Sequence, residues 1–103
     1  MSLSKQAKFF LRGEGRRLEP LARVGKEGVS AELVSSLRQL LEAHELVKLR
    51  FVAHKEERRA MSREIAEQAG AELVDVIGHV AVLYRAAQKP KPGALSEQIA
   101  ALE

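Results

Sequence analysis

Two glycines bracket two charged residues in the stretch Gly25-Lys26-Glu27-Gly28, and Ser30, a good helix N-cap, follows closely. Glycine lets the backbone turn sharply and lets a ligand approach it closely. A loop that opens onto the start of a helix also offers unpaired N–H groups and the positive end of the helix dipole, a combination that suits phosphate. Lys26 adds a positive charge at the tip. The pattern predicts a phosphate-binding loop, or, more simply, a tight turn between a strand and a helix.

The positive charges of the chain gather in its first quarter. Residues 1–26 carry seven Lys or Arg side chains and two Glu, a balance of +5, whereas residues 27–103 carry ten basic and twelve acidic side chains, a balance of −2. A basic end on a near-neutral body suggests a polyanionic partner. With three Phe, one Tyr and no Trp, the chain has few rings to stack on bases, so contacts to phosphates should dominate if the partner is a nucleic acid.

Composition narrows the classes of protein to which the chain can belong. Its 103 residues suit one domain. No apolar run approaches the roughly 20 residues that span a bilayer, and the N-terminus lacks the apolar segment of a secretory signal. The absence of Cys excludes disulfides, thiolate catalysis and Cys-ligated metals. We expect a cytoplasmic, monomeric protein with no membrane contact.

Enzymatic and metal-binding functions find little support in the sequence. His44, His54 and His79 show no ligand spacing, and we interpret them as one helix-terminal residue and two surface residues. The carboxylates are dispersed and do not converge as an acid–base pair. The arginines of residues 58–63 share a predicted helix with several Glu, which indicates a solvated, salt-bridged face, and we exclude them from the site. The expectation is a protein that is not an enzyme and holds no cofactor or metal.

Caps and hydrophobic periodicity predict the elements that must hold the glycine loop. The expected elements are a helix at 4–12, a strand at 21–24, a helix from 31 to about 43 capped by Ser30, a strand at 45–53, a helix ending near 69, and strands at 72–77 and 79–85 around a tight Gly78-His79 turn. Gly13 and Gly15 weaken the first helix, so it should fray before Arg16. The order α-β-α-β-α-β-β predicts a single α/β (α+β) domain with a four-stranded mixed sheet and helices packed on one face.

Alternation assigns the two faces of the strand at 45–53. Apolar residues at every second position point into the core, whereas Lys48 and Arg50 point into solvent, within reach of a phosphate. The expected core comprises Val34, Leu37, Leu41, Val47, Leu49, Phe51 and Ile77.

Two further segments carry positive charge. Arg16 and Arg17 have only Glu14 and Glu19 as acidic neighbours, and they extend the cationic surface if the first helix lies beside the glycine loop. The basic Pro/Gly segment at 89–93 is expected to be a linker with no core to join. Residues 95–102 can form a short helix.

Several of these motifs, in this order and spacing, resemble one known family. The motifs are Leu18-Glu19-Pro20-Leu21, Val24-Gly25-Lys26-Glu27-Gly28-Val29, His44-Glu45-Leu46-Val47-Lys48-Leu49-Arg50, Val76-Ile77-Gly78-His79 and Leu83-Tyr84-Arg85. Together they look like the YhbY-like proteins, the free-standing bacterial form of the CRM (chloroplast RNA splicing and ribosome maturation) domain. The resemblance covers about residues 3–86, so we expect 1–86 to form the CRM domain and 87–103 to form a linker and tail.

The resemblance implies a fold like that of the C-terminal domain of translation initiation factor three, and it implies RNA binding. The glycine loop would play the part of the GxxG loop of KH domains. Bacterial members are associated with precursors of the large ribosomal subunit, which makes ribosomal RNA the expected partner, and plant relatives act in intron splicing. The expected RNA-binding residues are Gly25, Lys26, Glu27, Gly28, Lys48, Arg50 and Arg85 from the resemblance, with Arg16 and Arg17 added from the charge pattern.

Two positions depart from the family pattern. Gly13-Glu14-Gly15 stands where helix-forming residues are expected, and Glu27 places a carboxylate beside the proposed phosphate site, which should weaken binding. The alternative function is a protein-binding adaptor on ribosomal particles with no direct RNA contact. Salt dependence separates the two, because phosphate contacts release counterions and therefore weaken as the salt concentration rises.

Overall fold

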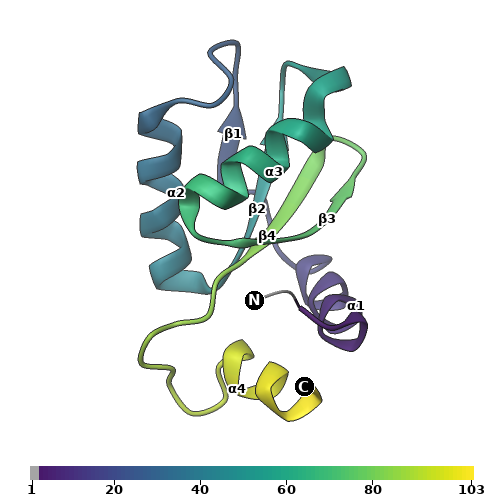
Figure 1. Cartoon of the computed structure of the whole chain (residues 1–103), viewed down its shortest axis with the longest axis vertical. Helices are drawn as coiled ribbons and strands as arrows, with labels where there is room; N and C mark the ends of the chain where they lie inside the picture. Colours follow the sequence, from purple (N-terminus) through teal and green to yellow (C-terminus); the bar gives the residue numbers. More distant parts are fainter. Residues whose placement is uncertain (1–2) are drawn as a thin grey trace.

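A four-stranded sheet in the order β1-β2-β4-β3 forms the centre of the computed structural model, which describes residues 3–103 (Figure 1). Met1 and Ser2, which begin the expected 1–86 region, lie outside the described residues. The strands are β1 (Ala22–Val24), β2 (Leu46–Phe51), β3 (Glu72–Ile77) and β4 (Val80–Tyr84). β1 and β2 are parallel, and β4 pairs antiparallel with both β2 and β3. The prediction of a four-stranded mixed sheet is confirmed.

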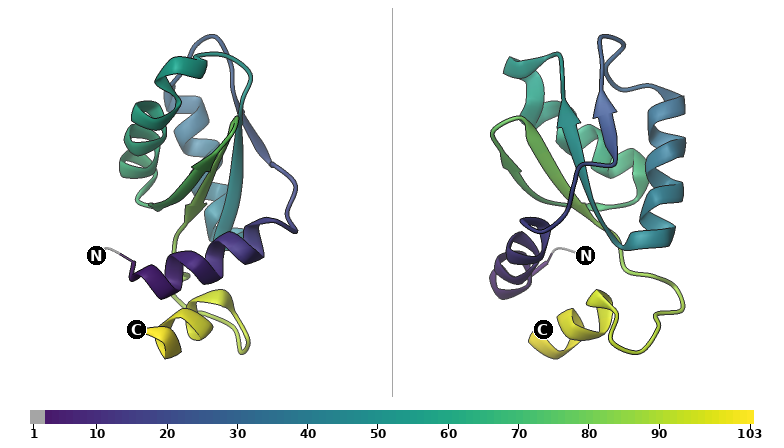
Figure 2. Two further views of the ribbon diagram at one scale, coloured as in Figure 1. Left: turned by 90° about the vertical axis from the view of Figure 1, so that its right-hand side faces the viewer. Right: turned by 180° about the vertical axis from the view of Figure 1, so that it is seen from behind.

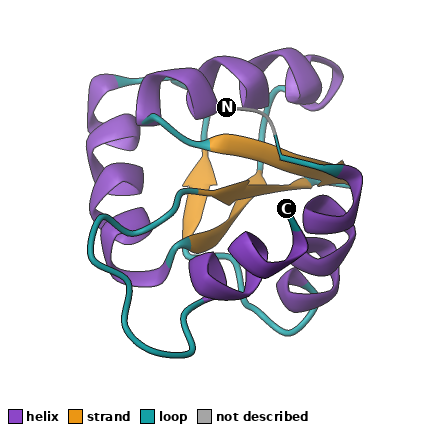
Figure 3. Cartoon of the chain, turned by 60° about the horizontal axis from the view of Figure 1, so that its bottom comes forward, coloured by secondary structure: helices purple, strands orange, loops and turns teal. Residues whose placement is uncertain are grey.

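The helices cover both faces of the sheet, so the expectation that they pack on one face is wrong (Figure 3). They are α1 (Lys5–Gly15), α2 (Ala31–His44), α3 (Arg58–Ala69) and α4 (Leu95–Leu102), with the short 3-10 helix η1 (Lys55–Glu57) before α3. α2 and α3 cover one face, while α1 and α4 cover one end of the other (Figure 2). The reason lies in β4, which is apolar at every position and therefore needs a cover on both sides.

The larger core lies between the sheet and the α2–α3 layer. α2 begins as predicted, since the Ser30 hydroxyl accepts a hydrogen bond from the Leu33 N–H at 3.1 Å. The fully or nearly buried members of this core are Val24, Leu37, Leu41, Val47, Leu49, Phe51, Ile65, Ala66, Ala69, Ala81 and Leu83. Val34, the remaining α2 residue of the expected core, is also buried.

Ile77, by contrast, is 54% exposed, and its assignment to the core is wrong. The register of β3 against β4 shifts between Leu73 and Asp75, so strict alternation fails there. As a result Leu73 and Val76 pack on the larger core, whereas Val74 packs on the opposite side. Ile77 then follows Val76 onto the opposite face, at the end of the sheet that α1 leaves uncovered.

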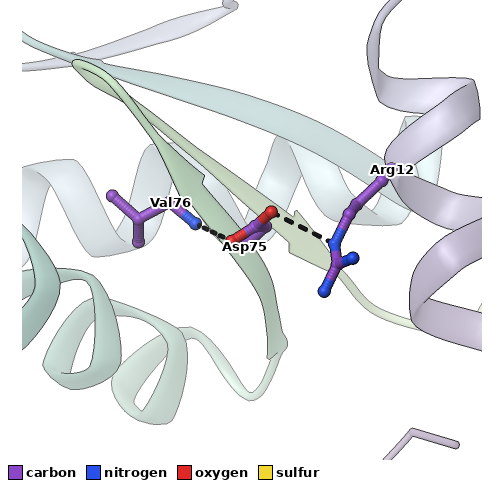
Figure 4. A network of polar contacts seen from close by, with 3 residues as sticks. All are labelled: Arg12, Asp75 and Val76. Atoms are coloured by element: carbon purple, nitrogen blue, oxygen red, sulfur yellow. Dashed lines mark hydrogen bonds and ion pairs between the residues drawn. The ribbon is translucent and has the colours of Figure 1, made fainter. Parts of the chain in front are cut away.

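α1 is longer than predicted, because it continues through Gly13 to Gly15. Tertiary contacts outweigh the low helix propensity of glycine here. A Cβ on the buried Gly15 would lie 3.4 Å from a methyl group of Val82, so the helix lies close against β4. Arg12 reaches from α1 to the sheet, where its Nε lies 3.1 Å from Oδ2 of Asp75 (Figure 4).

The C-terminal tail joins a second core through its helical part, which the sequence did not predict, whereas residues 89–93, the expected linker, are exposed. The predicted short helix forms as α4, and its Ile99 is buried against α1 and the sheet. The other buried members of this second core are Ala7, Leu11, Leu46, Val74, Val82 and Tyr84. Burial, followed by the charges of Glu45 and Glu103, raises the pKa of Tyr84 to about 12.

Glu45 fastens the tail to the domain. This residue ends α2 with a φ of 61°, a region that favours glycine, and its side chain is buried. Its carboxylate accepts hydrogen bonds from the Ala87 N–H at 2.7 Å and the Ser96 N–H at 3.3 Å. Burial acts to raise the pKa of Glu45, but the polar groups of Ser96, with the backbone N–H groups of Ala87 and Leu95, outweigh it and lower the pKa from 4.5.

Because the folded pKa of Glu45 is lowered, its contribution to stability is present above the ordinary pKa of 4.5 and is lost as the pH falls through the folded value. Glu45→Gln should therefore lower the free energy of unfolding by about 1–2 kcal/mol at pH 7. The difference from the parent should shrink as the pH falls below 4.5. Urea unfolding at neutral pH and at a series of pH values below 4.5 measures it, with the exposed Glu42→Gln as the matched control. A difference independent of pH would contradict the assignment.

Candidate functional site

The glycine loop forms a tight turn at the end of β1. The Gly28 N–H donates to the Gly25 carbonyl at 3.0 Å, and the side chains of Lys26 and Glu27 are exposed at the tip. Gly28 is buried with a φ of +66°, and a Cβ there would lie 2.8 Å from Cε of Met61. The left-handed φ favours glycine here, and any larger residue would also displace the end of the Met61 side chain. The N–H groups of the first turn of α2, which have no partner within the helix, follow directly.

Contacts from the β2–α3 connection hold the loop in place. Nε2 of His54 lies 2.8 Å from the Lys26 carbonyl oxygen, and because a carbonyl can only accept, the ring nitrogen must carry the proton. The Val52 N–H donates to the Val24 carbonyl at 3.0 Å. His54, which the sequence places on the surface, is half-buried and orients the loop. Its partner lies 28 residues earlier, and no local pattern predicts such a contact.

Three connections meet at this end of the sheet (Figure 1), and we call residues 25–28, 52–57 and 78–79 together the loop end. The Phe51 N–H donates to the His79 carbonyl at 2.7 Å, and Nη1 of Arg58 lies 3.0 Å from Nδ1 of His79. Arg58, one of the arginines excluded at 58–63, therefore sits beside the loop end. The charge here is mixed, because Lys26 and Lys55 stand with Glu27 and two further glutamates in η1.

A second cationic surface lies on the face of the sheet opposite α2 and α3. Arg23 of β1 is the register partner of Arg50 of β2, and both side chains are exposed. Lys48, on the same face, is half-buried, and its Nζ donates to the Leu18 carbonyl at 3.1 Å. We call Arg23, Lys48 and Arg50 the arginine face. α1 covers only the far end of this side of the sheet and leaves β1 and the end of β2 open (Figure 2, right).

The prediction that Lys48 and Arg50 both point into solvent is confirmed for Arg50 and only in part for Lys48. Arg50 is exposed as predicted, whereas the ammonium of Lys48 has a backbone partner. Arg23 was missed, although the signal was present: Ala22 and Val24 face the core, so the residue between them must face solvent.

The sequence model of the CRS1 / YhbY (CRM) domain matches residues 3–85. The chain belongs to this family. It is 32% identical over 93 residues to the "Probable RNA-binding protein PA4753" of Pseudomonas aeruginosa, which covers 89% of this chain and 88% of that protein. It is 30% identical over 90 residues to the "Probable RNA-binding protein YqeI" of Bacillus subtilis, which covers 86% and 94%.

The fold of this CRM domain also matches a solved structure. The solution structure of the hypothetical protein SAV1595 from Staphylococcus aureus, described as a candidate RNA binding protein, superposes with a TM-score of 0.77 at 27% identity. The match covers 86% of this chain and 94% of the Staphylococcus aureus chain. The resemblance seen in the sequence motifs is therefore confirmed at the level of family and fold.

The remaining expected site residues of the CRM domain lie away from the loop end. α1 packs at the other end of the sheet, so Arg16 and Arg17 do not lie beside the glycine loop (Figure 2). Arg17 instead stands 3.9 Å from Glu14. Arg85 follows β4 at that same far end, where its N–H donates to the Glu45 carbonyl at 2.8 Å. The structure brings the glycine loop together with Arg23 and Arg50, and it places Arg85 at the far end of the sheet. Arg17 is not beside the glycine loop, but it lines one hollow with Lys48 of the arginine face.

Residues 3–103 contain neither a cluster of metal ligands nor a helix that could span a membrane. No group of three or more His, Asp or Glu in this part of the chain could hold a metal ion. None of its helices combines the length and the apolar character needed to cross a bilayer.

Proposed function

We propose that this CRM domain binds RNA through the phosphate backbone, at the glycine loop and the arginine face. The observation that carries the proposal is the exposed pair Arg23 and Arg50, side by side on an open sheet face. Arg23 lies two residues before Gly25, so the pair leads directly into the loop. Neighbouring strands lie about 4.8 Å apart, which places two guanidinium groups where one RNA strand can contact both.

The glycine loop is the second part of the proposed RNA-binding surface. Its backbone is fixed by the turn at Gly25 and by His54, so little conformational entropy is lost when a ligand binds. A phosphate at the tip would meet the Lys26 ammonium and the N-terminus of α2. Glu27 opposes this contact, and we infer that the loop positions RNA and that the arginine face supplies much of the attraction.

The partner we propose is ribosomal RNA, free or within precursors of the large ribosomal subunit, in the cytoplasm. Two relatives carry RNA binding in their names, and the family resemblance links bacterial members to those precursors. The protein would act as a monomeric binding module and not as an enzyme. A particle-bound adaptor that contacts only protein is the competing outcome of the test below.

Replacing both Arg23 and Arg50 by alanine should flatten the salt dependence of RNA binding. Each lost phosphate contact removes about 0.7 (single strand) to 0.9 (duplex) from the slope of log K against log salt, so the slope should fall by about 1.4 to 1.8. Filter binding to a structured ribosomal RNA fragment at several salt concentrations measures this slope. Both side chains are exposed, so the stability should change by less than about 0.5 kcal/mol.

The matched control removes the same net charge elsewhere, by replacing Arg63 of α3 and Lys91 of the tail, both exposed, with alanine. This pair should leave the slope within about 0.5 of the parent. Equal slopes for the two double variants would place the RNA on another surface. A parent chain that retains no RNA at any salt concentration would favour the adaptor.

A further inference from the structure

α1 exposes an aromatic ring on the side that faces away from the sheet. Ala7, Leu11 and Gly15 form the buried side of this helix, whereas Phe9 is 75% exposed. No other large apolar side chain within residues 3–103 is as exposed. A single exposed apolar side chain is common in proteins. The surroundings of Phe9 distinguish it from such isolated cases.

Gly13 stands one helical turn after Phe9, on the same exposed side. Glycine inside a helix is destabilising relative to alanine. Packing does not require it here: among the described residues, no heavy atom lies within 4 Å of the position of a Cβ, and φ is not left-handed. A helical side chain leans toward the N-terminus, over the preceding turn. A long side chain at position 13 would therefore lie over the turn that carries Phe9, whereas glycine leaves this turn open.

Positive charge surrounds the open ring. Lys5 lies one turn before Phe9 and Arg16 lies two turns after it, on the same side of α1, with Lys8 along the flank. Within residues 3–103 none of these three cations forms an ion pair. α1 carries no acidic residue in its first turn. An open hollow of about 790 Å³ runs beside the ring toward Leu102 of α4.

We propose that this face of α1 binds an unpaired nucleotide, with the base stacked on Phe9 and the neighbouring phosphates held by Lys5 and Arg16. The inference rests on the proposed RNA binding and extends it to a second contact. A nucleotide combines a flat ring with a negative charge at its side, which matches an open aromatic ring between cations. A partner helix would need a continuous apolar stripe. The hollow beside the ring has two further apolar side chains, Phe10 and Leu102, but the rest of its lining is Gln6 and the cations Lys5, Lys8 and Arg12, which favours an anionic ligand.

This second contact lies at the opposite end of the molecule from the loop end (Figure 1). The longest dimension of the domain is 39 Å, so one RNA that touches both sites must extend along most of it. Paired RNA can satisfy phosphate contacts at the loop end and the arginine face, but its bases are stacked inside the helix. Only an unpaired segment offers a free base to Phe9. The proposal therefore predicts a preference for RNA that has a stem with a single-stranded extension over a plain duplex of equal length.

Phe9→Ala should weaken binding of such a stem with extension about tenfold, the loss expected for one stacked base, and leave duplex binding unchanged. Phe9→Trp should keep the affinity. Because the chain has no Trp, this variant has a single indole, whose fluorescence should be quenched by the single-stranded probe and not by the duplex. Ser36→Trp, on the exposed side of α2, is the matched control and should not be quenched.

Gly13→Gln provides a second, independent variant. Glutamine favours the helix, so the unfolding midpoint should stay the same or rise, while the covered ring should bind the single-stranded probe severalfold less tightly. Ser36→Gln on α2 is its control, and it should bind like the parent. A lower affinity without a loss of stability excludes misfolding as the cause.

Three outcomes would overturn the inference. The first is an unchanged affinity of Phe9→Ala for the single-stranded extension, and the second is no response of the Phe9→Trp indole to it. The third is quenching of that indole by polyglutamate and not by RNA, which would assign the face to an acidic protein. If the parent and the arginine-face variants behave as proposed while Phe9→Ala binds normally, only this second contact fails. If the parent retains no RNA, the proposed function fails with it.

Discussion

Leu37→Ala should lower the free energy of unfolding by about 2–5 kcal/mol, because it removes a fully buried side chain from the middle of the larger core. Leu37 lies on the inner side of α2, in one cluster with Val47 and Leu49 of β2. Truncation would leave a cavity between the helix and the sheet, in addition to the lost transfer free energy. Urea unfolding followed by far-UV circular dichroism measures the change, provided that the transition stays two-state.

Gln39→Ala, two residues further along α2, is the matched control. Its side chain is exposed, so the free energy of unfolding should change by less than about 0.5 kcal/mol. A loss below that same value for Leu37→Ala would place Leu37 outside the core, against its complete burial.

Local patterns predicted the α2–β2 half of the fold well. The Ser30 cap, the apolar stripe of α2 and the alternation along β2 are each set by residues close in sequence, and the structure has all three. The same alternation in β1 places Arg23 on the solvent side, between the inward-facing Ala22 and Val24. Family membership could be read from the motifs for a similar reason, since their order and spacing survive in the linear sequence.

The features that sequence analysis missed depend on contacts between distant residues. The bulge in β3 moves Ile77 to the opposite side of the sheet, and no residue type in this strand predicts the bulge. From the sequence alone, Glu45 looks like an ordinary surface glutamate. In the structure its carboxylate accepts hydrogen bonds from Ala87 and Ser96, which lie more than 40 residues later in the chain. α1 continues through Gly13 only because the helix packs on a sheet face that was expected to be bare. The last two cases share one cause, which is that the second layer of helices was not predicted.

Replacing Lys26 and Glu27 together by aspartate should weaken RNA binding at least tenfold, about 1.4 kcal/mol. The variant brings negative charge to the tip of the glycine loop, where a phosphate would lie. Both glycines remain, so the turn and the close approach of Gly28 to Met61 are kept. The His54 contact also remains, because it is made to the Lys26 backbone carbonyl. Phosphate contacts carry no sequence information, so all RNA ligands should lose affinity about equally.

The fold of this double variant should be intact, since both altered side chains are exposed and the Ser30 cap is unchanged. An unfolding midpoint equal to that of the parent checks this point. Glu27→Lys should have the opposite effect on RNA affinity. It removes the carboxylate beside the proposed phosphate site, so it should tighten binding slightly. Filter binding at one salt concentration ranks the parent and the two variants. If the double aspartate variant folds and binds ribosomal RNA as well as the parent does, the glycine loop is only a turn, and the RNA is held by other residues of the domain.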